Sequence, residues 1–235
     1  LGGLIHKVNR LGMDFGLWVE PEMVNPNSEL YRAHPDWVIH WPGRRRTESR
    51  NQLILNLGRP EVQEYLISVL DRMLSENNIA FIKWDMNRNA SEPGWVDAPG
   101  DPRELWVRYV QGLYRVWETL RQRHPQVIFQ SCASGGGRAE LGILRLADQV
   151  WVSDNTEATC RLDIQEGYSQ FLPANTMEAW VTDADKGRVP LEFRFHVSMC
   201  GSLGVGGNLL EWSAEERALA AACIQQYKEL RPIIQ

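Results

Sequence analysis

Short apolar strands alternate with amphipathic helices along almost the whole chain, and this alternation constrains the fold most. Six strand-like runs are each followed by a helical or loop-helix segment: Asp14–Val19, Ile79–Asp85, Val127–Gln130, Gln149–Val152, Met177–Val181 and Leu203–Gly206. The pattern predicts an α/β protein with parallel strands and crossover helices. No GxGxxG or P-loop follows a strand, and polar residues gather after several different strands. We therefore expect a (β/α)8 TIM barrel rather than a doubly wound sheet.

The number of strands also bears on where the chain lies in its protein. Six strand–helix units are two fewer than a closed (β/α)8 barrel contains. The chain begins without Met, inside a helical stripe formed by Leu1, Leu4, Ile5 and Val8. We expect residues 1–235 to be a partial barrel domain of a longer protein, with the first two units preceding Leu1.

The stretch Ile79–Arg88 changes from a buried strand to a polar segment within a few residues. Period-two spacing places Lys83, Asp85 and Asn87 on one face and the apolar residues between them on the other. A second carboxylate, Asp154, follows the strand two units further on. In a closed barrel the two carboxylates should face one another at about 5 Å, the separation that glycoside cleavage with retention uses. The alternative is an Asp–Lys pair that only caps a strand.

Composition excludes several other classes of partner. The net charge of −5 gives no electrostatic reason to expect nucleic acid or an anionic membrane. The four cysteines form no CxxC pair, which argues against a zinc site or a disulfide framework and favours a reducing, cytoplasmic compartment. No apolar run approaches the roughly 18 residues of a membrane helix. We expect neither a cofactor nor a metal.

Six motifs resemble, in this order, those of the α-galactosidases of glycoside hydrolase family 36. They are Gly16–Glu22, Arg50–Leu53, Lys83–Asn87, Ser131–Gly137, Ser153–Glu157 and Pro190–His196. Each motif alone is weak, but together they cover nearly the whole chain.

The resemblance implies a retaining α-galactosidase, which removes terminal α-D-galactosyl residues from oligosaccharides such as melibiose or raffinose through a covalent glycosyl-enzyme. It makes Asp85 the nucleophile and Asp154 the acid/base. The residues implied to line the galactose subsite are Trp18, Arg50, Lys83, Asn87, Cys132 and Gly135. The resemblance also implies flanking β-sandwich domains outside the chain, and it allows a homo-oligomer of the full-length protein.

Two features depart from the family pattern. Glu157 stands where the family has Asp, so whatever that side chain orients is shifted by one methylene. The paired Asp-Asp that holds the galactose hydroxyls would lie upstream of Leu1. Three alternatives therefore stay open: a transglycosylating relative, a sugar-binding fragment without activity, and a metal-assisted barrel enzyme that uses Asp85, Asp154 and Asp183 as ligands.

The remaining polar residues have two interpretations each. Asp183 and Asp185 either cap a loop or touch substrate, and the cap is favoured. His196 is expected to be a structural histidine on a helix. The glycines at 135–137 allow close backbone approach to a ligand or form a tight turn between strand and helix. The basic run Arg44–Arg46 is expected to be a solvated loop.

Overall fold

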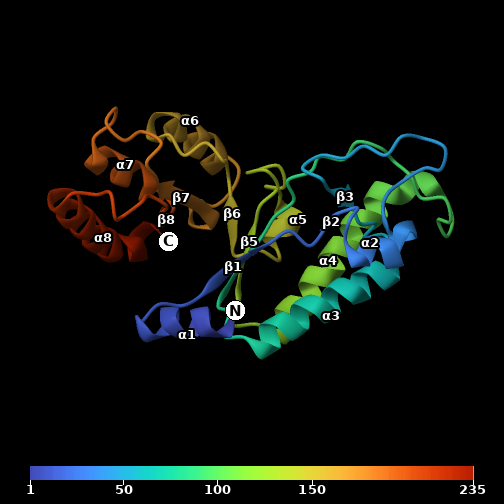
Figure 1. Cartoon of the computed structure of the whole chain (residues 1–235). Coiled ribbons are helices and arrows are strands. Elements are labelled where there is room, and N and C mark those ends of the chain that lie inside the picture. Colours follow the sequence, from blue (N-terminus) through green and yellow to red (C-terminus); the bar gives the residue numbers. More distant parts are fainter. Residues whose placement is uncertain (235) are drawn as a thin grey trace. The chain divides into compact units, whose positions relative to one another are not determined.

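The computed structural model of the chain describes residues 1–234 (Figure 1), which fall into two compact units, residues 1–129 and residues from 130 onward. Each unit is built from strands and helices that alternate along the chain. The elements of the first unit are α1 (Gly2–Arg10), β1 (Gly16–Val19), β2 (Met23–Val24), α2 (Glu29–Ala33), η1 (Pro35–Trp37), β3 (Leu53–Ile54), α3 (Pro60–Glu76), β4 (Phe81–Trp84), η2 (Pro102–Glu104) and α4 (Leu105–Arg123).

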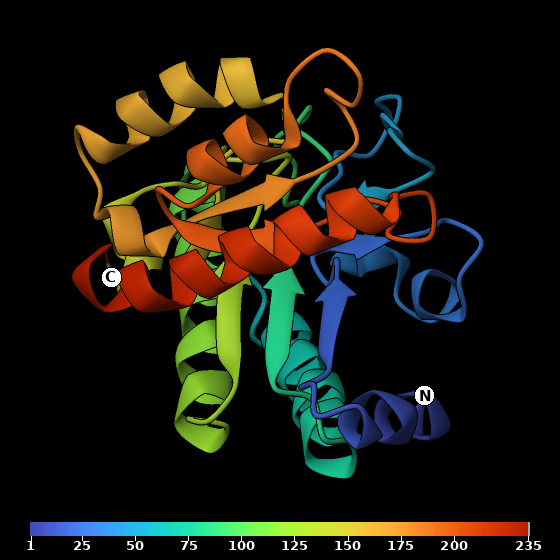
Figure 2. The same cartoon turned by 90° about the vertical axis from the view of Figure 1, so that its left-hand side faces the viewer.

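Strands β1 and β4 form a parallel pair in the first unit, seen as neighbouring arrows of the same direction in Figure 2. The register places Trp18 opposite Lys83 and Val19 opposite Trp84. The pairing continues one residue past β4, because the amide of Asp85 donates to the carbonyl of Val19 at 2.9 Å. The strand end that carries Asp85 is therefore fixed by backbone hydrogen bonds to β1.

The core of the first unit lies between this sheet and the helices α3 and α4, which pack side by side (Figure 1). Pro60 occupies the first turn of α3, where its missing N–H is not needed. The buried rings of Trp84, Trp117 and Phe129 follow one another at centroid distances of 5.2 and 5.5 Å. These aromatic contacts join β4 to α4.

The second unit holds four parallel strands in the order β5, β6, β7, β8. Its elements are β5 (Ile128–Ser131, which begins at the end of the first unit), α5 (Leu141–Leu144), β6 (Gln149–Trp151), α6 (Ala158–Ser169), η3 (Ala174–Thr176), β7 (Met177–Val181), α7 (Leu191–Ser198), β8 (Ser202–Val205) and α8 (Ala214–Ile234). Helices α7 and α8 pack on β7 and share one core cluster, which includes Val181, Phe195 and Tyr227. The Tyr227 hydroxyl donates to the carbonyl of Gly201 at 2.9 Å and so ties α8 to the start of β8.

All six predicted strands are confirmed, with ends that differ by at most two residues, and every strand pair among them within either unit is parallel. The expected α/β class with a parallel sheet is correct. The short antiparallel pair β2–β3 was not predicted as a pair. Closure into an eight-stranded barrel with two further units stays a prediction. Among residues 1–234, no helix combines the length and the apolar character that crossing a membrane requires.

Candidate active site

Asp85 lies just beyond the end of β4, and its carboxylate is held by hydrogen bonds from neighbouring side chains. The side chain of Asp85 is 5% exposed. Its Oδ2 accepts from Trp18 Nε1 at 2.9 Å and from Asn87 Nδ2 at 2.7 Å. Hydrogen bonds from two donors restrict the rotation of the carboxylate. This geometry suits a carboxylate that must meet a substrate atom in one orientation.

The predicted face of the strand end is confirmed in part. Asp85 and Asn87 meet on the same side, as the period-two spacing requires. Asn87 donates an amide N–H to Asp85, and its contact with the sugar, which the resemblance implies, stays a prediction. The indole N–H of Trp18 also binds Asp85, but the Trp18 side chain is 49% exposed, which leaves its ring face open to a ligand. Lys83 is half-buried and lies opposite Trp18 in the register.

On the opposite face of β4, a second carboxylate is enclosed in the core of the first unit. Glu22 is fully buried, and its Oε1 accepts from Trp84 Nε1 at 2.8 Å while its Oε2 accepts from the Tyr109 hydroxyl. Buried carboxylates need such donors to offset lost solvation. Glu22 therefore links β4 to α4 on the face of the strand that carries Trp84.

Arg50 is exposed at the tip of a tight turn formed by residues 49–52. Ser49 and Gln52 exchange backbone hydrogen bonds, and both residues between them have positive φ, 56° for Arg50 and 57° for Asn51. This left-handed conformation is uncommon for residues other than glycine. The turn is held from below by Arg88, whose Nε donates to the carbonyl of Gln52 at 3.0 Å. Arg50 thus lies in a turn whose backbone is held by the hydrogen bond from Arg88.

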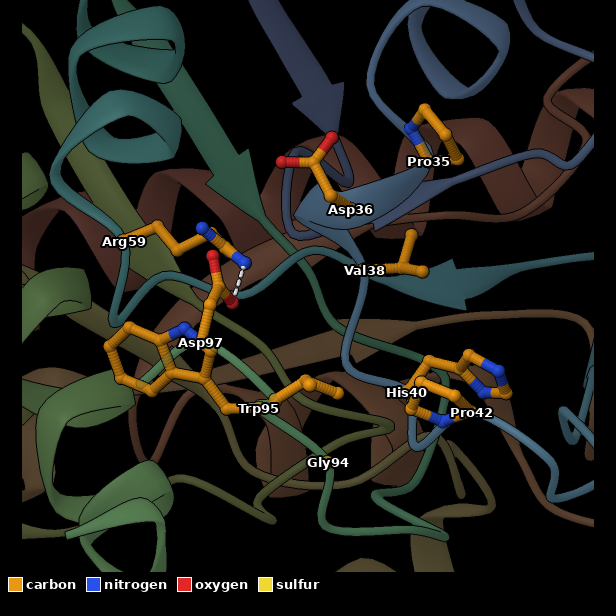
Figure 3. Close-up of a pocket in the computed structure, with 10 residues that line it drawn as sticks. Pro35, Asp36, Val38, His40, Pro42, Arg59, Gly94, Trp95 and Asp97 are labelled. Atoms are coloured by element: carbon orange, nitrogen blue, oxygen red, sulfur yellow. Dashed lines mark hydrogen bonds and ion pairs between the residues drawn. The ribbon is translucent and has the colours of Figure 1, made fainter. Parts of the chain in front are cut away.

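The first unit also contains a cavity of about 290 Å³ that lies apart from Asp85 (Figure 3). Arg59 and Asp97 form an ion pair on one side of it, and His40 and Pro42 lie on the other. None of the predicted site residues lines this cavity. Its Trp95 is only 4% exposed, and the indole N–H does not reach the surface. Since no predicted site residue lines the cavity, we do not assign the site to it.

In the second unit, Asp154 is exposed in the segment that follows β6. Its Oδ1 accepts from Trp151 Nε1 at 2.7 Å, and Trp151 in turn stacks at a tilt on Trp180 with ring centroids 4.6 Å apart. A buried indole thus orients an exposed carboxylate. Exposure suits a group that must exchange protons with water, as an acid/base must.

The glycine loop of residues 135–137 packs directly against the segment that carries Asp154. A Cβ on Gly136 would lie 2.5 Å from the carbonyl oxygen of Val152, and one on Gly135 would lie 3.0 Å from Ser153 Cα. Gly135 also has φ of +86°. The glycines are therefore required by close packing of backbone on backbone, which is the tight-turn interpretation. A contact of Gly135 with substrate stays a prediction.

Arg161 is the buried cation that holds this segment from the side of α6. It is 2% exposed, and its guanidinium donates to the carbonyls of Ser153 at 3.3 Å and Glu178 at 2.6 Å. Burial lowers the pKa of Arg161 to about 10, so the guanidinium remains charged at neutral pH. Its carbon Cζ also lies 5.7 Å from the Trp151 ring centroid. Arg161 thus fixes both the backbone before Asp154 and the indole that binds it.

Cys132 is a predicted subsite residue that the structure buries. It is 1% exposed, so its thiol is shielded from solvent within the chain. Its contribution to a galactose subsite stays a prediction.

The loop-cap interpretation of Asp183 and Asp185 is confirmed. Asp183 accepts from the Asn208 amide at 2.7 Å and from Trp212 Nε1 at 3.0 Å, and the backbone hydrogen bond from Asn208 lowers the pKa of Asp183. Asp185 is buried and accepts from the Ala158 amide, which caps the start of α6.

Glu157, the residue that departs from the family pattern, is tied to the loop after β7. Arg188 Nη2 donates to Glu157 Oε1 at 2.6 Å, and this bond lowers the pKa of the Glu157 carboxyl. The same guanidinium binds Asp185 Oδ1 at 3.0 Å. The longer side chain of Glu157 is therefore engaged with Arg188 rather than with Asp154.

Two further expectations concern surface residues. His196 lies on α7 as predicted, but its side chain is exposed, so the interpretation as a structural histidine is wrong. Arg44 and Arg45 are exposed and Arg46 is half-buried over the Tyr31 ring, in the loop that was expected to be solvated.

The structure describes no group of three or more His, Cys, Asp or Glu side chains within residues 1–234 that could hold a metal ion. The buried polar residues Glu22, Arg88 and Arg161 were not singled out from the sequence. Each has at least one partner that is distant in the chain, and local pattern carries no signal for those contacts.

Known proteins similar to this chain were found by sequence and by structure. The family model described as Melibiase matches residues 1–235. The α-galactosidase AgaA of Geobacillus stearothermophilus is 44% identical over an alignment of 240 positions, which covers 100% of this chain and 33% of that protein. The α-galactosidase C of Emericella nidulans is 45% identical over 224 residues, 94% of this chain and 29% of that protein.

Solved structures agree with these relatives. A crystal structure of an AgaA variant, a GH36 α-galactosidase, in complex with 1-deoxygalactonojirimycin superposes with a TM-score of 0.96 at 43% identity, covering 100% of this chain and 33% of that one. A further AgaA variant in complex with raffinose has a TM-score of 0.96 at 42% identity and the same coverage. The chain thus spans about a third of the length of these relatives. The match over the whole chain shows that it belongs to the melibiase family.

Proposed function

We propose that the protein containing this chain is an α-galactosidase that hydrolyses terminal α-galactosides with retention of configuration. The names of the relatives support the activity. Solved structures of AgaA variants with raffinose and stachyose support oligosaccharide substrates. The observation that carries the proposal is the carboxylate of Asp85, held at the end of a parallel strand by two side-chain donors.

Asp85 is the nucleophile in this proposal. Its carboxylate attacks the anomeric carbon of the galactosyl unit, and the bond from that carbon to the glycosidic oxygen breaks. The product is a β-linked galactosyl ester of Asp85, and the aglycone leaves with a proton. Trp18 and Asn87 both donate to Oδ2, which holds the carboxyl plane while an oxygen forms the new bond.

Asp154 is the acid/base. It gives its proton to the departing glycosidic oxygen in the first step and removes a proton from the attacking water in the second. The water then displaces Asp85, which returns as a carboxylate, and α-galactose is released. Trp151 Nε1 holds one oxygen of Asp154 at 2.7 Å, and the exposure of Asp154 supports proton exchange with solvent between turnovers.

Substitution followed by azide rescue in the full-length protein distinguishes the nucleophile, Asp85, from the acid/base, Asp154. We expect Asp85→Ala to lose roughly 10⁴-fold or more in kcat on an aryl α-galactoside. Azide should then attack the vacated face and yield β-galactosyl azide. In Asp154→Ala, azide should instead attack the galactosyl ester and yield α-galactosyl azide. Undiminished turnover by Asp85→Ala would exclude the assignment.

Two measurements complete the test. Asp163→Ala removes an exposed carboxylate from α6 and serves as the control, since it should retain full activity. The first anomer released, followed by NMR, should be α-galactose, and β-galactose would contradict retention. High concentrations of a sugar acceptor would reveal a transglycosylating enzyme through an oligosaccharide product in place of free galactose.

A further inference from the structure

Glu20 connects two segments of the first unit that carry predicted site residues. It lies directly after β1, and each of its carboxylate oxygens receives one hydrogen bond. Oε1 accepts from the backbone amide of Asn87 at 2.7 Å, and Oε2 accepts from Gln52 Nε2 at 2.7 Å. Asn87 also donates through its side chain to Asp85, while Gln52 closes the turn that presents Arg50. One carboxylate therefore bridges the nucleophile segment and the arginine turn.

The turn needs such an anchor because its backbone is strained. Arg50 and Asn51 both have positive φ, which a chain without glycine holds only when its surroundings fix the turn. The carbonyl of Asn51 accepts from Asn25 Nδ2 at 3.0 Å, and the carbonyl of Gln52 accepts from Arg88. These bonds fix the turn at its backbone. Glu20 supplies the side-chain contact at Gln52, and the same carboxylate reaches the amide of Asn87 beside the nucleophile.

We propose that Glu20 is a positioning residue, which holds the Arg50 turn and the Asp85–Asn87 segment in a fixed relation through its two carboxylate oxygens. The proposal rests on the proposed function, in which Asp85 attacks the sugar and Arg50 binds it. In this proposal Glu20 acts without touching the substrate or the reacting atoms. Its effect comes through Asn87 on one side and Gln52 on the other.

Truncation at position 20 removes both acceptors at once. A carboxylate accepts on both oxygens, and Glu20→Ala loses the link to Asn87 and the link to Gln52 together. Glu20→Gln is the conservative variant, because its carbonyl oxygen accepts from the Asn87 amide and its N–H can donate to Gln52 Oε1 once the Gln52 carboxamide rotates by 180°. Since Gln52 Oε1 receives no hydrogen bond from residues 1–234, that rotation breaks no other bond of the carboxamide.

The kinetic test compares these variants in the full-length protein with an aryl α-galactoside as substrate. We expect Glu20→Ala to lower kcat/KM by roughly 10- to 100-fold, the cost of a displacement approaching 1 Å in a catalytic group. Gln52→Ala frees only the Arg50 turn and should act mainly on KM. Glu20→Gln should recover most of the activity lost in Glu20→Ala. Glu48→Ala removes an exposed carboxylate of the same loop, is the matched control and should leave kcat and KM unchanged.

A second readout does not depend on activity. Glu20→Ala should speed hydrogen exchange at the Asn87 amide, while the control Glu48→Ala should not. If the parent enzyme turns over α-galactosides but Glu20→Ala matches Glu48→Ala in both kcat and KM, the positioning role is wrong. If the parent has no such activity, the proposed function fails, and unchanged exchange at Asn87 in Glu20→Ala would then overturn the link from Glu20 on its own.

Discussion

Gly136 offers a direct way to displace Asp154 without touching its side chain. A Cβ at this position would lie 2.5 Å from the carbonyl oxygen of Val152, whereas ordinary van der Waals contact begins at 3.4 Å. Gly136→Ala therefore requires the glycine loop and the backbone before Asp154 to move apart by about 0.5–0.9 Å. A displacement of this size in a catalytic group costs about 10²-fold in rate. We expect a loss of that order in kcat/KM for Gly136→Ala.

The leaving group decides whether this loss comes from the acid/base. Raffinose needs protonation of its departing oxygen, whereas a dinitrophenyl α-galactoside leaves without it. The loss should therefore be large on raffinose and small on the dinitrophenyl substrate. Gly167→Ala on α6 is the control, since its Cβ would meet nothing within 4 Å and an alanine favours the helix. Equal losses on both substrates, or activity equal to that of Gly167→Ala, would refute the reasoning.

Two further predictions concern the stability of the first unit. Trp117→Ala should lower the free energy of unfolding by about 3–5 kcal/mol, because it removes the ring between Trp84 and Phe129. The exposed Val107→Ala is the control, and a shift in the thermal midpoint for Trp117→Ala no larger than that of the control would contradict this. The hydrogen bond from His124 and the ion pair with Arg123 lower the pKa of Asp71 below its ordinary 3.8. The stability that this carboxylate contributes is therefore present above pH 3.8 and is lost as pH falls through the lowered pKa. Denaturant unfolding from pH 6 to pH 2 should show a gap between the parent and Asp71→Asn that closes at acid pH, and a gap that stays constant would exclude the linkage.

The strands were predictable because each is an apolar run of several residues between polar segments. Met177–Val181 was predicted to the residue. The strands β2 and β3 contain two residues each, too few for a period, and they pair across about thirty residues that include α2 and η1. Helix α6 begins at Ala158, whose amide is capped by Asp185. That cap comes from a loop that no local pattern connects to the helix.

In the candidate site, too, the sequence predicted the residues that local patterns mark and did not predict the contacts between distant segments. Asp85 and Asp154 were found because strand ends and motifs mark them. The direction of each N–H was not predictable, and the hydrogen bonds from Trp18 and Asn87 to Asp85 were not predicted. The bridge from Glu20 to Gln52 joins residues that are 32 positions apart. Such contacts are decided by the packing of the folded chain.

The most direct test of the account is the capture of the covalent intermediate. A fluorinated galactosyl fluoride slows the second step more than the first, so the galactosyl ester should accumulate in the full-length protein. Peptide mass spectrometry should then locate the fluorogalactosyl group on Asp85. The label on another residue, or turnover of the parent substrate with no labelled peptide, would contradict the central claim.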